Sequence, residues 1–271
     1  MAGVARRRLD AELVRRKLAR SREQASQLIA AGRVTVGGTT ATKAATQVET
    51  GAAIVVTDDG DGPDYVSRGG HKLAGALAAF TPLGLVVEGR RALDAGASTG
   101  GFTDVLLRAG AAHVFAVDVG YGQLAWSLQS DDRVTVKDRT NVRELTPEAL
   151  DGTSVDLVVG DLSFIPLGLV LPALVRCTAP GADLVLMVKP QFEVGKERLG
   201  SGGVVRSAEL RKETVRTVAG QAAALGLGVL GVTASPLPGP SGNVEYFLWL
   251  RAGAPELDPA DVDRAVAEGP R

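Results

Sequence analysis

Cysteine, histidine and aromatic side chains are scarce in this sequence of 271 residues, which has one cysteine, two histidines and 4% aromatic residues. The single Cys177 cannot form an intramolecular disulfide, and with only His71 and His113 beside it no zinc cluster can be assembled. Carboxylates alone could still bind a metal ion, but no pattern supports such a site. We therefore expect no bound metal.

Long apolar runs are also missing. None approaches the roughly 20 residues that span a bilayer, and the basic N-terminus is not followed by the apolar core of a signal peptide. The composition, 45% hydrophobic and 23% charged, is that of a soluble globular protein. We expect a cytoplasmic protein with room for one large domain, or for a small and a medium one.

Charge is unevenly distributed along the chain. The net charge is −1, yet residues 1–57 hold ten Lys or Arg against four Asp or Glu, which gives +6 there and −7 in the remainder. A small basic module on a larger, acidic body is typical of a protein that binds a polyanion such as RNA.

The basic module contains two helical patterns. Leu9, Leu13 and Leu18 fall near helical spacing, and Ser21 with Gln24 forms a capping-box pattern that predicts the start of a second helix. The segments "RVTVGG" and "GAAIVVT" then indicate short strands around turns rich in glycine and threonine.

This order of elements resembles the ribosomal protein S4-like RNA-binding domain over residues 5–57, most clearly in "LVRRKLARSREQASQLIAAGRVTVGG". A solvated basic helix face would give the same charge pattern, but the position in front of an enzyme-like body favours RNA. The resemblance implies that basic side chains bind RNA phosphates. The candidate RNA-binding residues are Arg6, Arg15, Arg16, Lys17, Arg20, Arg22, Arg33 and Arg68.

A polar segment, "TDDGDGPD", separates this module from the rest of the chain and predicts a linker at residues 58–64. From residue 65 to residue 271, apolar runs of strand length alternate with helical stretches such as residues 102–109. The runs are "RALDAG", "HVFAVDVG", "VTVKD", "VDLVVGD" and "DLVLMVKP". This alternation predicts an α/β domain with a mostly parallel sheet and helices on both faces. Ligands of such sheets bind beyond the carboxyl ends of the strands.

A glycine-rich turn, "LDAGASTGGFT", follows the first of these runs and predicts a cofactor site. Glycines allow close approach of the backbone to a ligand, and the following helix N-terminus offers free N–H groups. The glycine spacing does not match the dinucleotide fingerprint, which disfavours a nicotinamide cofactor. Asp94 at the strand end suits a ligand with a cationic group, such as S-adenosylmethionine, and Asp118 is placed to bind ribose hydroxyls. The candidate cofactor-binding residues are Asp94, Gly96, Ser98, Thr99, Gly100, Gly101, Phe102, Asp118 and Asp138.

Charged residues stand at the ends of later runs. Asp161 follows "VDLVVG", Lys189 follows "LVLMV", and Glu245 begins the final run "VEYFLWL". If that final strand is antiparallel, its start lies at the same rim as the ends of the others. Lys72 lies beside the apolar stripe of a predicted helix, on the side that we expect to face the cofactor.

The order Lys72, Asp161, Lys189, Glu245 matches the tetrad of the FtsJ-like ribose 2′-O-methyltransferases. The motifs "SRGGHKL", "LDAGASTGGFT", "DVGYGQLAW", "DLSFI", "VKPQFE" and "SPLPGPSGNVEYFLWL" resemble the TlyA group, over about residues 5–251. The resemblance implies a Rossmann-like body with a seven-stranded sheet fused to the S4-like domain. It also implies methyl transfer from S-adenosylmethionine to cytidine 2′-hydroxyls of small- or large-subunit ribosomal RNA.

The chemistry suggests a role for each member of the tetrad. A ribose hydroxyl is a poor nucleophile and benefits from a base or an oriented acceptor. A lysine becomes a base when desolvation or a neighbouring cation removes its charge, and Lys189 near Lys72 at the end of a buried strand meets both conditions. We expect Lys189 to accept the proton or hold the oxygen, Asp161 to orient Lys189, and Lys72 with Glu245 to position the ribose. Two ordinary ion pairs at the edge of a core are the alternative.

Other functions remain open from the sequence. A nicotinamide oxidoreductase lacks the required glycine pattern, and an RNA-binding protein with an inert body would not need the complete tetrad. Some relatives carry a haemolysin label, which would require pore formation without a spanning segment. We expect ribosomal RNA or ribosomal subunits as partners, no membrane, and a monomer or weak dimer.

Overall fold

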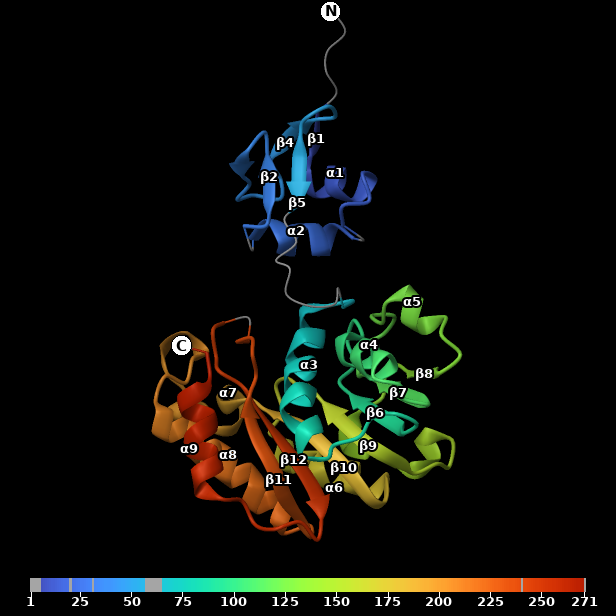
Figure 1. The fold of residues 1–271 in the computed structure, drawn as a ribbon, viewed down its shortest axis with the longest axis vertical. Coiled ribbons are helices and arrows are strands. Elements are labelled where there is room, and N and C mark those ends of the chain that lie inside the picture. Colours follow the sequence, from blue (N-terminus) through green and yellow to red (C-terminus); the bar gives the residue numbers. More distant parts are fainter. Residues whose placement is uncertain (1–5, 20, 31, 57–64, 240, 271) are drawn as a thin grey trace, which may run out of the picture. The chain divides into compact units, whose positions relative to one another are not determined.

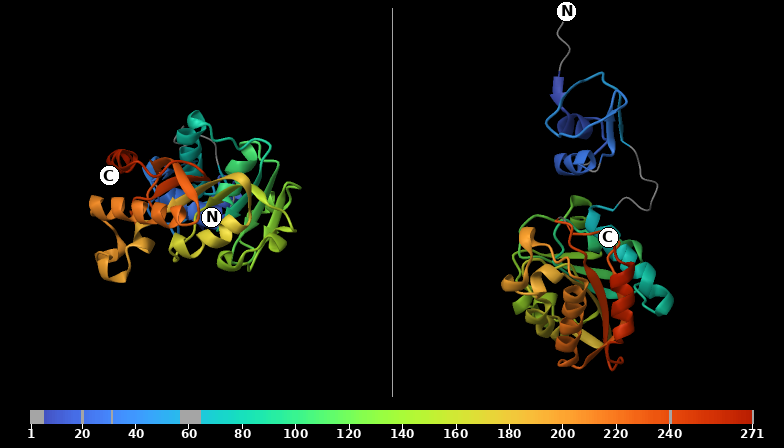
Figure 2. Two further views of the ribbon diagram at one scale, coloured as in Figure 1. Left: turned by 90° about the horizontal axis from the view of Figure 1, so that it is seen from below. Right: turned by 90° about the vertical axis from the view of Figure 1, so that its left-hand side faces the viewer.

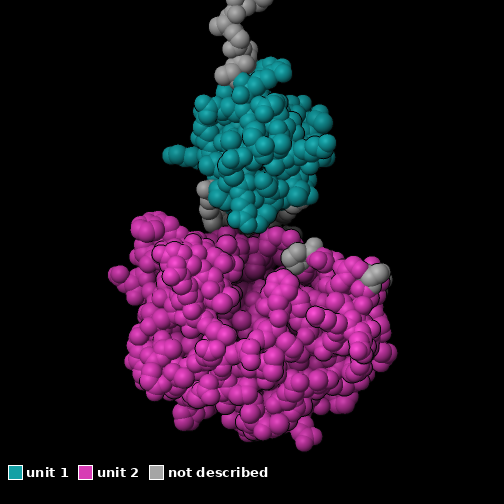
Figure 3. Space-filling view, turned by 180° about the vertical axis from the view of Figure 1, so that it is seen from behind, with its two compact units in different colours: residues 1–64 teal, residues 65–271 magenta. Residues whose placement is uncertain are grey.

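The computed structural model describes residues 6–19, 21–30, 32–56, 65–239 and 241–270. The chain divides into two compact units, Met1–Asp64 and Tyr65–Arg271, which have different colours in Figure 3. The predicted linker at residues 58–64 and the candidate Arg20 lie outside the described residues.

The first unit packs two helices against short antiparallel strands (Figure 1). Its helices are α1 (Leu9–Arg15) and α2 (Arg22–Ala30), and its strands are β1 (Arg6–Arg8), β2 (Val34–Val36), β3 (Thr39–Thr40), β4 (Gln47–Glu49) and β5 (Ile54–Val56). β1 pairs with β4, and β2 lies between β3 and β5. Leu9, Leu13, Ile29 and Val34 form its core.

Two local sequence predictions in this unit have different outcomes. The backbone N–H of Gln24 donates to Ser21 Oγ at 3.1 Å, so the predicted start of the second helix is confirmed. Leu18, by contrast, is 36% exposed and lies beyond the end of α1, so its predicted place in one helix with Leu9 and Leu13 is wrong. The reason is that α1 ends at Arg15 and Lys17 adopts a left-handed backbone with φ of 60°, which breaks the helical spacing before Leu18.

The second unit is built on a seven-stranded sheet in the order β11-β12-β10-β9-β6-β7-β8, which confirms the predicted α/β class. The strands are β6 (Arg91–Ala95), β7 (His113–Val117), β8 (Val134–Lys137), β9 (Val155–Gly160), β10 (Thr178–Val188), β11 (Leu227–Ala234) and β12 (Tyr246–Ala252). β12 runs antiparallel to both of its neighbours, β10 and β11, and the remaining described pairings are parallel. The predicted antiparallel final strand is therefore confirmed.

Helices cover both faces of this sheet (Figures 1 and 2). One face carries α3 (Arg68–Phe80), α4 (Gly101–Arg108) and α5 (Trp126–Gln129), and the other carries α6 (Leu171–Arg176), α8 (Ala208–Ala223) and α9 (Pro259–Glu268). The connections hold α7 (Pro190–Glu193) and 3-10 turns η1 (Thr81–Leu83), η2 (Val142–Glu144), η3 (Pro147–Leu150), η4 (Leu167–Leu169), η5 (Lys196–Arg198) and η6 (Ser201–Gly203). Among the described residues, no helix is long and apolar enough to cross a membrane.

Candidate active site

Strand alternation places Lys189 and Glu245 of the predicted tetrad on the face of the sheet that carries Lys72. Val188 at the end of β10 and Tyr246 at the start of β12 are paired in register, and both pack into the core beneath α6, α8 and α9. Because successive side chains of a strand point to opposite faces, the next residues, Lys189 and Glu245, belong to the face covered by α3. Lys72 projects from α3 itself, so the three meet at the carboxyl end of the parallel strands.

Lys72 and Glu245 form a buried ion pair. Lys72 Nζ lies 2.5 Å from Glu245 Oε2, and the side chains of the two residues are 9% and 1% exposed. Gln191 Nε2 donates to the other carboxylate oxygen of Glu245 at 3.2 Å. The sequence placed Lys72 off the apolar stripe of its helix, but the side chain is buried and paired rather than free.

Lys189 and Asp161 form the second pair. Lys189 Nζ lies 2.6 Å from Asp161 Oδ1, with side chains that are 8% and 22% exposed. Lys189 also donates to Ser163 Oγ at 2.8 Å, and its ammonium lies 5.9 Å from the centre of the Phe192 ring. The arrangement therefore consists of two lysine–carboxylate pairs, each extended by one uncharged polar side chain.

Asp94 is a buried acid beside these pairs. Its Oδ2 accepts a hydrogen bond from Thr103 Oγ1 at 2.7 Å, whereas no described residue hydrogen-bonds Oδ1. Burial raises the pKa of Asp94 to about 7, and the negative charge of Asp161 adds to this effect. A buried carboxylate without a counter-charge is the environment that a ligand's ammonium group would stabilise.

The glycine-rich turn is shaped by backbone conformations that other residues rarely adopt. Gly96 and Gly100 have φ of 85° and 97°. A Cβ on Gly101 would lie 2.4 Å from Ser67 Oγ and 2.7 Å from the backbone nitrogen of Gly70, so α4 begins in close contact with α3. This turn leaves the backbone of residues 96–101 close to the carboxyl ends of β6 and β9.

Two predicted cofactor residues hold the neighbouring loops through backbone N–H groups. Asp118 accepts from Ser98 N at 2.8 Å and from Gly120 N at 2.7 Å. Asp138 accepts from Gly122 N at 2.8 Å. Each carboxylate oxygen has a second lone pair, so both residues can still accept from ribose or adenine groups.

The remaining cofactor candidates occupy different environments. Phe102 is 3% exposed and packs against Phe247 with ring centres 6.0 Å apart, so its side chain is part of the core. Thr99 contributes a carbonyl that accepts from Ala125 N at 3.1 Å.

Several predicted RNA-binding arginines pair with carboxylates of their own unit. Arg15 and Arg16 contact the buried Glu12 at 2.6 and 2.8 Å, and Arg16 also donates to two backbone carbonyls. Arg22 pairs with the buried Asp10 at 2.9 Å. Hydrogen bonds from Arg8 lower the pKa of Asp10, and those from Arg15 lower that of Glu12.

Exposure differs among these basic side chains. Arg16 is only 22% exposed, and Arg6, which faces Glu49 at 3.4 Å, is 65% exposed. Lys17 and Arg68 are exposed, and Arg33 is half-buried. Arg16 is thus mainly a structural residue of this unit, whereas Arg6, Lys17 and Arg68 present their charge to solvent.

Sequence reasoning overlooked three polar residues of the site: Thr103, Ser163 and Gln191. Ser163 and Gln191 each stand two positions after a tetrad member, in "DLSFI" and "VKPQFE". That spacing is a signal because Ser163 follows Asp161 on one loop and Gln191 lies in α7 directly after Lys189, but only the side-chain contacts reveal the partner.

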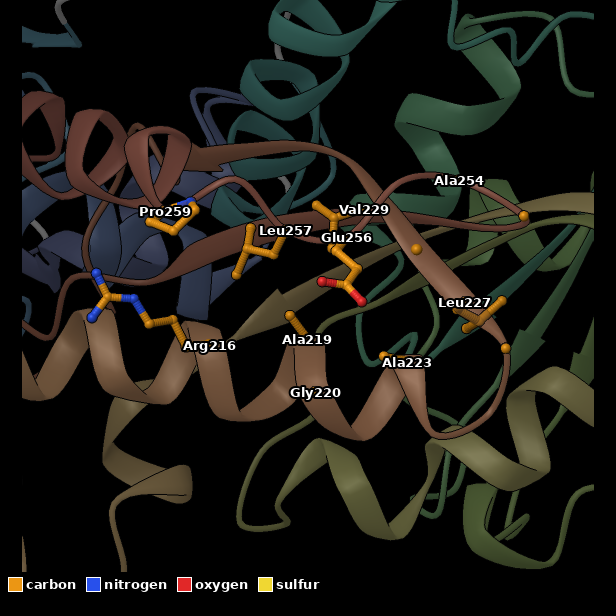
Figure 4. Close-up of a pocket in the computed structure, with 13 residues that line it drawn as sticks. Arg216, Ala219, Gly220, Ala223, Leu227, Val229, Ala254, Glu256, Leu257 and Pro259 are labelled. Carbon is orange, nitrogen blue, oxygen red and sulfur yellow. The ribbon is translucent and has the colours of Figure 1, made fainter.

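A separate pocket of about 610 Å³ lies between α8, the start of β11 and the segment that joins β12 to α9 (Figure 4). Arg216 and Glu256 line it together with small and apolar residues. Leu227 at its edge pairs with Ala252, at the opposite end of β12 from Tyr246. The pocket is therefore remote from the charged tetrad.

Models of two protein families match the chain: FtsJ-like methyltransferase over residues 65–252 and S4 domain over residues 7–54. The 16S/23S rRNA (cytidine-2′-O)-methyltransferase TlyA of Mycobacterium tuberculosis is 60% identical, covering 98% of this chain and 99% of that protein. "Putative rRNA methyltransferase YqxC" of Bacillus subtilis is 40% identical over 96% of this chain and 93% of its own. A solved structure, "Putative hemolysin from Streptococcus thermophilus", has a TM-score of 0.77 and 38% identity, covering 98% of this chain and 96% of that one.

Proposed function

Because the chain belongs to the TlyA family, which joins an S4 domain to an FtsJ-like methyltransferase body, we propose that its charged tetrad carries out the methyl transfer of that family. The protein is an S-adenosylmethionine-dependent ribosomal RNA ribose 2′-O-methyltransferase. The haemolysin names of some relatives are secondary to this activity.

The observation that supports this assignment is the pairing of two lysines with two carboxylates at one rim, next to the glycine-rich turn. When bound, S-adenosylmethionine supplies an electrophilic methyl group, and its sulfur–carbon bond breaks as the bond from carbon to the ribose oxygen forms. Lys189 holds the 2′-oxygen in line, and the hydroxyl proton passes to solvent as the new carbon–oxygen bond forms. Asp161 balances the charge of Lys189.

Lys72 and Glu245 have a positioning role in this proposal. Their pair is buried and accepts a hydrogen bond from Gln191, so it forms a rigid surface on one side of the site. Holding the hydroxyl near the methyl group is sufficient for a large rate gain, since orientation alone is worth several kcal/mol. This rigid surface restricts where the ribose can lie.

The glycine-rich turn and Asp94 fit the proposed cofactor. The carboxyl group of Asp94 lacks a described hydrogen-bond partner at Oδ1 and would pair with the amino group of the methionine portion. Ser98, Thr99, Gly100 and Gly101 would offer backbone groups to the ligand. Asp118 would accept from ribose hydroxyls and Asp138 from the adenine amino group.

We further propose cytidine as the target, in RNA of the small or large subunit, because the relative from Mycobacterium tuberculosis carries that activity in its name. The S4 domain would supply affinity through phosphate contacts from its exposed basic side chains. A monomer or weak dimer in the cytoplasm is consistent with a substrate that is itself a large particle.

Methyl transfer to unmodified ribosomal subunits tests the assignment. The protein is incubated with S-adenosylmethionine labelled in its methyl group and with separated small and large subunits, and the modified ribose is mapped. We expect Lys189→Ala to lose at least about a hundredfold in rate while binding the cofactor normally. Full activity of Lys189→Ala would refute the role of Lys189, and no transfer by the unaltered protein would favour an RNA-binding protein with an inert body.

A further inference from the structure

Lys189 has two polar contacts of different kinds. Asp161 Oδ1 lies 2.6 Å from Lys189 Nζ, yet it accepts no aligned hydrogen bond. Ser163 Oγ lies 2.8 Å away and does accept one. An ion pair depends on distance, whereas a hydrogen bond also depends on angle, so only the serine contact fixes the direction of an N–H group.

Ser163 lies on a short loop that is held at both ends. The loop starts at Asp161, whose N–H donates to the carbonyl of Ala95 in β6 at 3.2 Å. It ends at Leu167, whose N–H donates to Glu193 Oε1 of α7 at 2.8 Å. A loop tied to the central sheet at one end and to the Lys189-bearing segment at the other keeps the distance between Ser163 and Lys189 fixed.

The backbone immediately after Ser163 has an unusual conformation. Phe164 has φ of 64°, a left-handed conformation that costs a non-glycine residue of order 1 kcal/mol or more. The Phe164 side chain is 90% exposed, and its ring lies 5.1 Å from that of Phe192. The chain bends here, and the two neighbouring side chains point in different directions: the Ser163 hydroxyl contacts Lys189 and the Phe164 ring faces solvent.

We infer that Ser163 is a positioning residue of the methyl transfer, because its hydroxyl fixes the Lys189 amine so that one remaining direction faces the ribose 2′-oxygen. Asp161 compensates the charge of Lys189, and the hydrogen bond to Ser163 fixes the direction in which the Lys189 amine points. This inference rests on the proposed role of Lys189.

Without the hydroxyl, the Lys189 amine can turn toward Asp161. The ion pair is retained after the loss, because it does not depend on angle. The amine then spends less time aligned with the substrate, and small misplacements of reacting groups reduce rates strongly. Binding of cofactor and RNA does not involve this hydrogen bond, so only the rate of the methyl-transfer step should fall.

Three variants test the inference. Ser163→Ala removes the hydroxyl, and Ser163→Thr retains it at an exposed position that has room for a methyl group. Ser154→Ala is the matched control, because this exposed serine precedes β9 whereas Ser163 follows it. Each full-length protein is mixed in excess with unmethylated ribosomal subunits, and the rate of a single turnover is measured at saturating S-adenosylmethionine.

We expect Ser163→Ala to lower the single-turnover rate about tenfold, as the loss of one hydrogen bond to a charged group implies. Ser163→Thr and Ser154→Ala should remain within about twofold of the unaltered protein. Affinity for S-adenosylmethionine, affinity for the subunits and the midpoint of thermal unfolding should be unchanged in all three.

Two results would overturn the role of Ser163 alone. One is a rate for Ser163→Ala within about twofold of the unaltered protein. The other is an equal loss in Ser163→Ala and Ser163→Thr, which would mean that the hydroxyl is not the group that matters. No transfer by the unaltered protein would overturn the proposed function and this inference together.

Discussion

Replacing Asp94 by asparagine removes a fully buried carboxyl group whose pKa is raised to about 7, mainly by burial. In the unfolded chain the same group has its ordinary pKa of 3.8. Between these two values the folded protein binds one proton more than the unfolded chain does. The contribution of Asp94 to the free energy of unfolding therefore falls as pH rises through this window and becomes constant above about pH 7.

The size of this effect follows from the width of the window. One proton of difference changes the free energy of unfolding by about 1.4 kcal/mol per pH unit, which gives about 4 kcal/mol over the whole window. In the accessible range from pH 5 to pH 8 the expected loss is about 3 kcal/mol. Asparagine does not titrate, so Asp94→Asn lacks this component. Any cost of placing its amide near Thr103 is independent of pH.

Urea unfolding, monitored by tryptophan fluorescence, reports on the structural unit that contains Asp94, because both tryptophans, Trp126 and Trp249, belong to Tyr65–Arg271. The unfolding free energy of the unaltered protein minus that of Asp94→Asn should fall by about 3 kcal/mol from pH 5 to pH 8. A difference that stays constant across this range would refute the reasoning, since it would mean that the pKa of Asp94 is not raised by burial.

Three further predictions concern other parts of the molecule. Glu245→Ala leaves the Lys72 ammonium buried without its partner and should lower the free energy of unfolding by about 3–5 kcal/mol. The apolar double variant Lys72→Met with Glu245→Leu should leave the free energy of urea unfolding nearly unchanged. Gly100→Ala should lower the thermal midpoint and cofactor affinity more than Gly122→Ala. Both glycines have positive φ, but only a Cβ at Gly100 would lie within 4 Å of other atoms. Equal effects of the two substitutions in calorimetry would mean that crowding at Gly100 is unimportant. RNA affinity should fall steeply with salt, and Lys17→Ala should reduce the slope of log affinity against log salt by about one in filter-binding titrations; an unchanged slope would place Lys17 away from phosphate.

Much of the body could be predicted from its apolar runs. Strands buried on both faces are continuous in hydrophobicity, and a charge that ends such a run marks the sheet edge, as Asp161 and Lys189 do. β11 escaped recognition because its glycines and threonine interrupt the pattern. The antiparallel direction of β12 was predictable only through the family resemblance, because the sequence of a single strand does not indicate whether it pairs in a parallel or an antiparallel way.

Side-chain partners could not be predicted in the same way. The pairing of Lys72 with Glu245 joins positions 173 residues apart, so only the family's tetrad led us to expect it, and it depends on how α3 packs against the sheet at the start of β12. The inward contacts of Arg16 and Arg22 were also hidden, because an arginine bound to a buried acid and one that faces solvent have the same local sequence. Ser163 was visible as a residue but not as the partner of Lys189.

The position of β12 has a consequence for the order in which the sheet is assembled. β12 follows the other described strands of the sheet in the sequence, yet it inserts between β10 and β11, and it is the only described strand that pairs with β11. Until β12 has been made, Lys72 lacks the carboxylate of Glu245 with which it pairs. The four charged residues therefore come together only when β12 inserts, after every other described strand of the sheet has been synthesised.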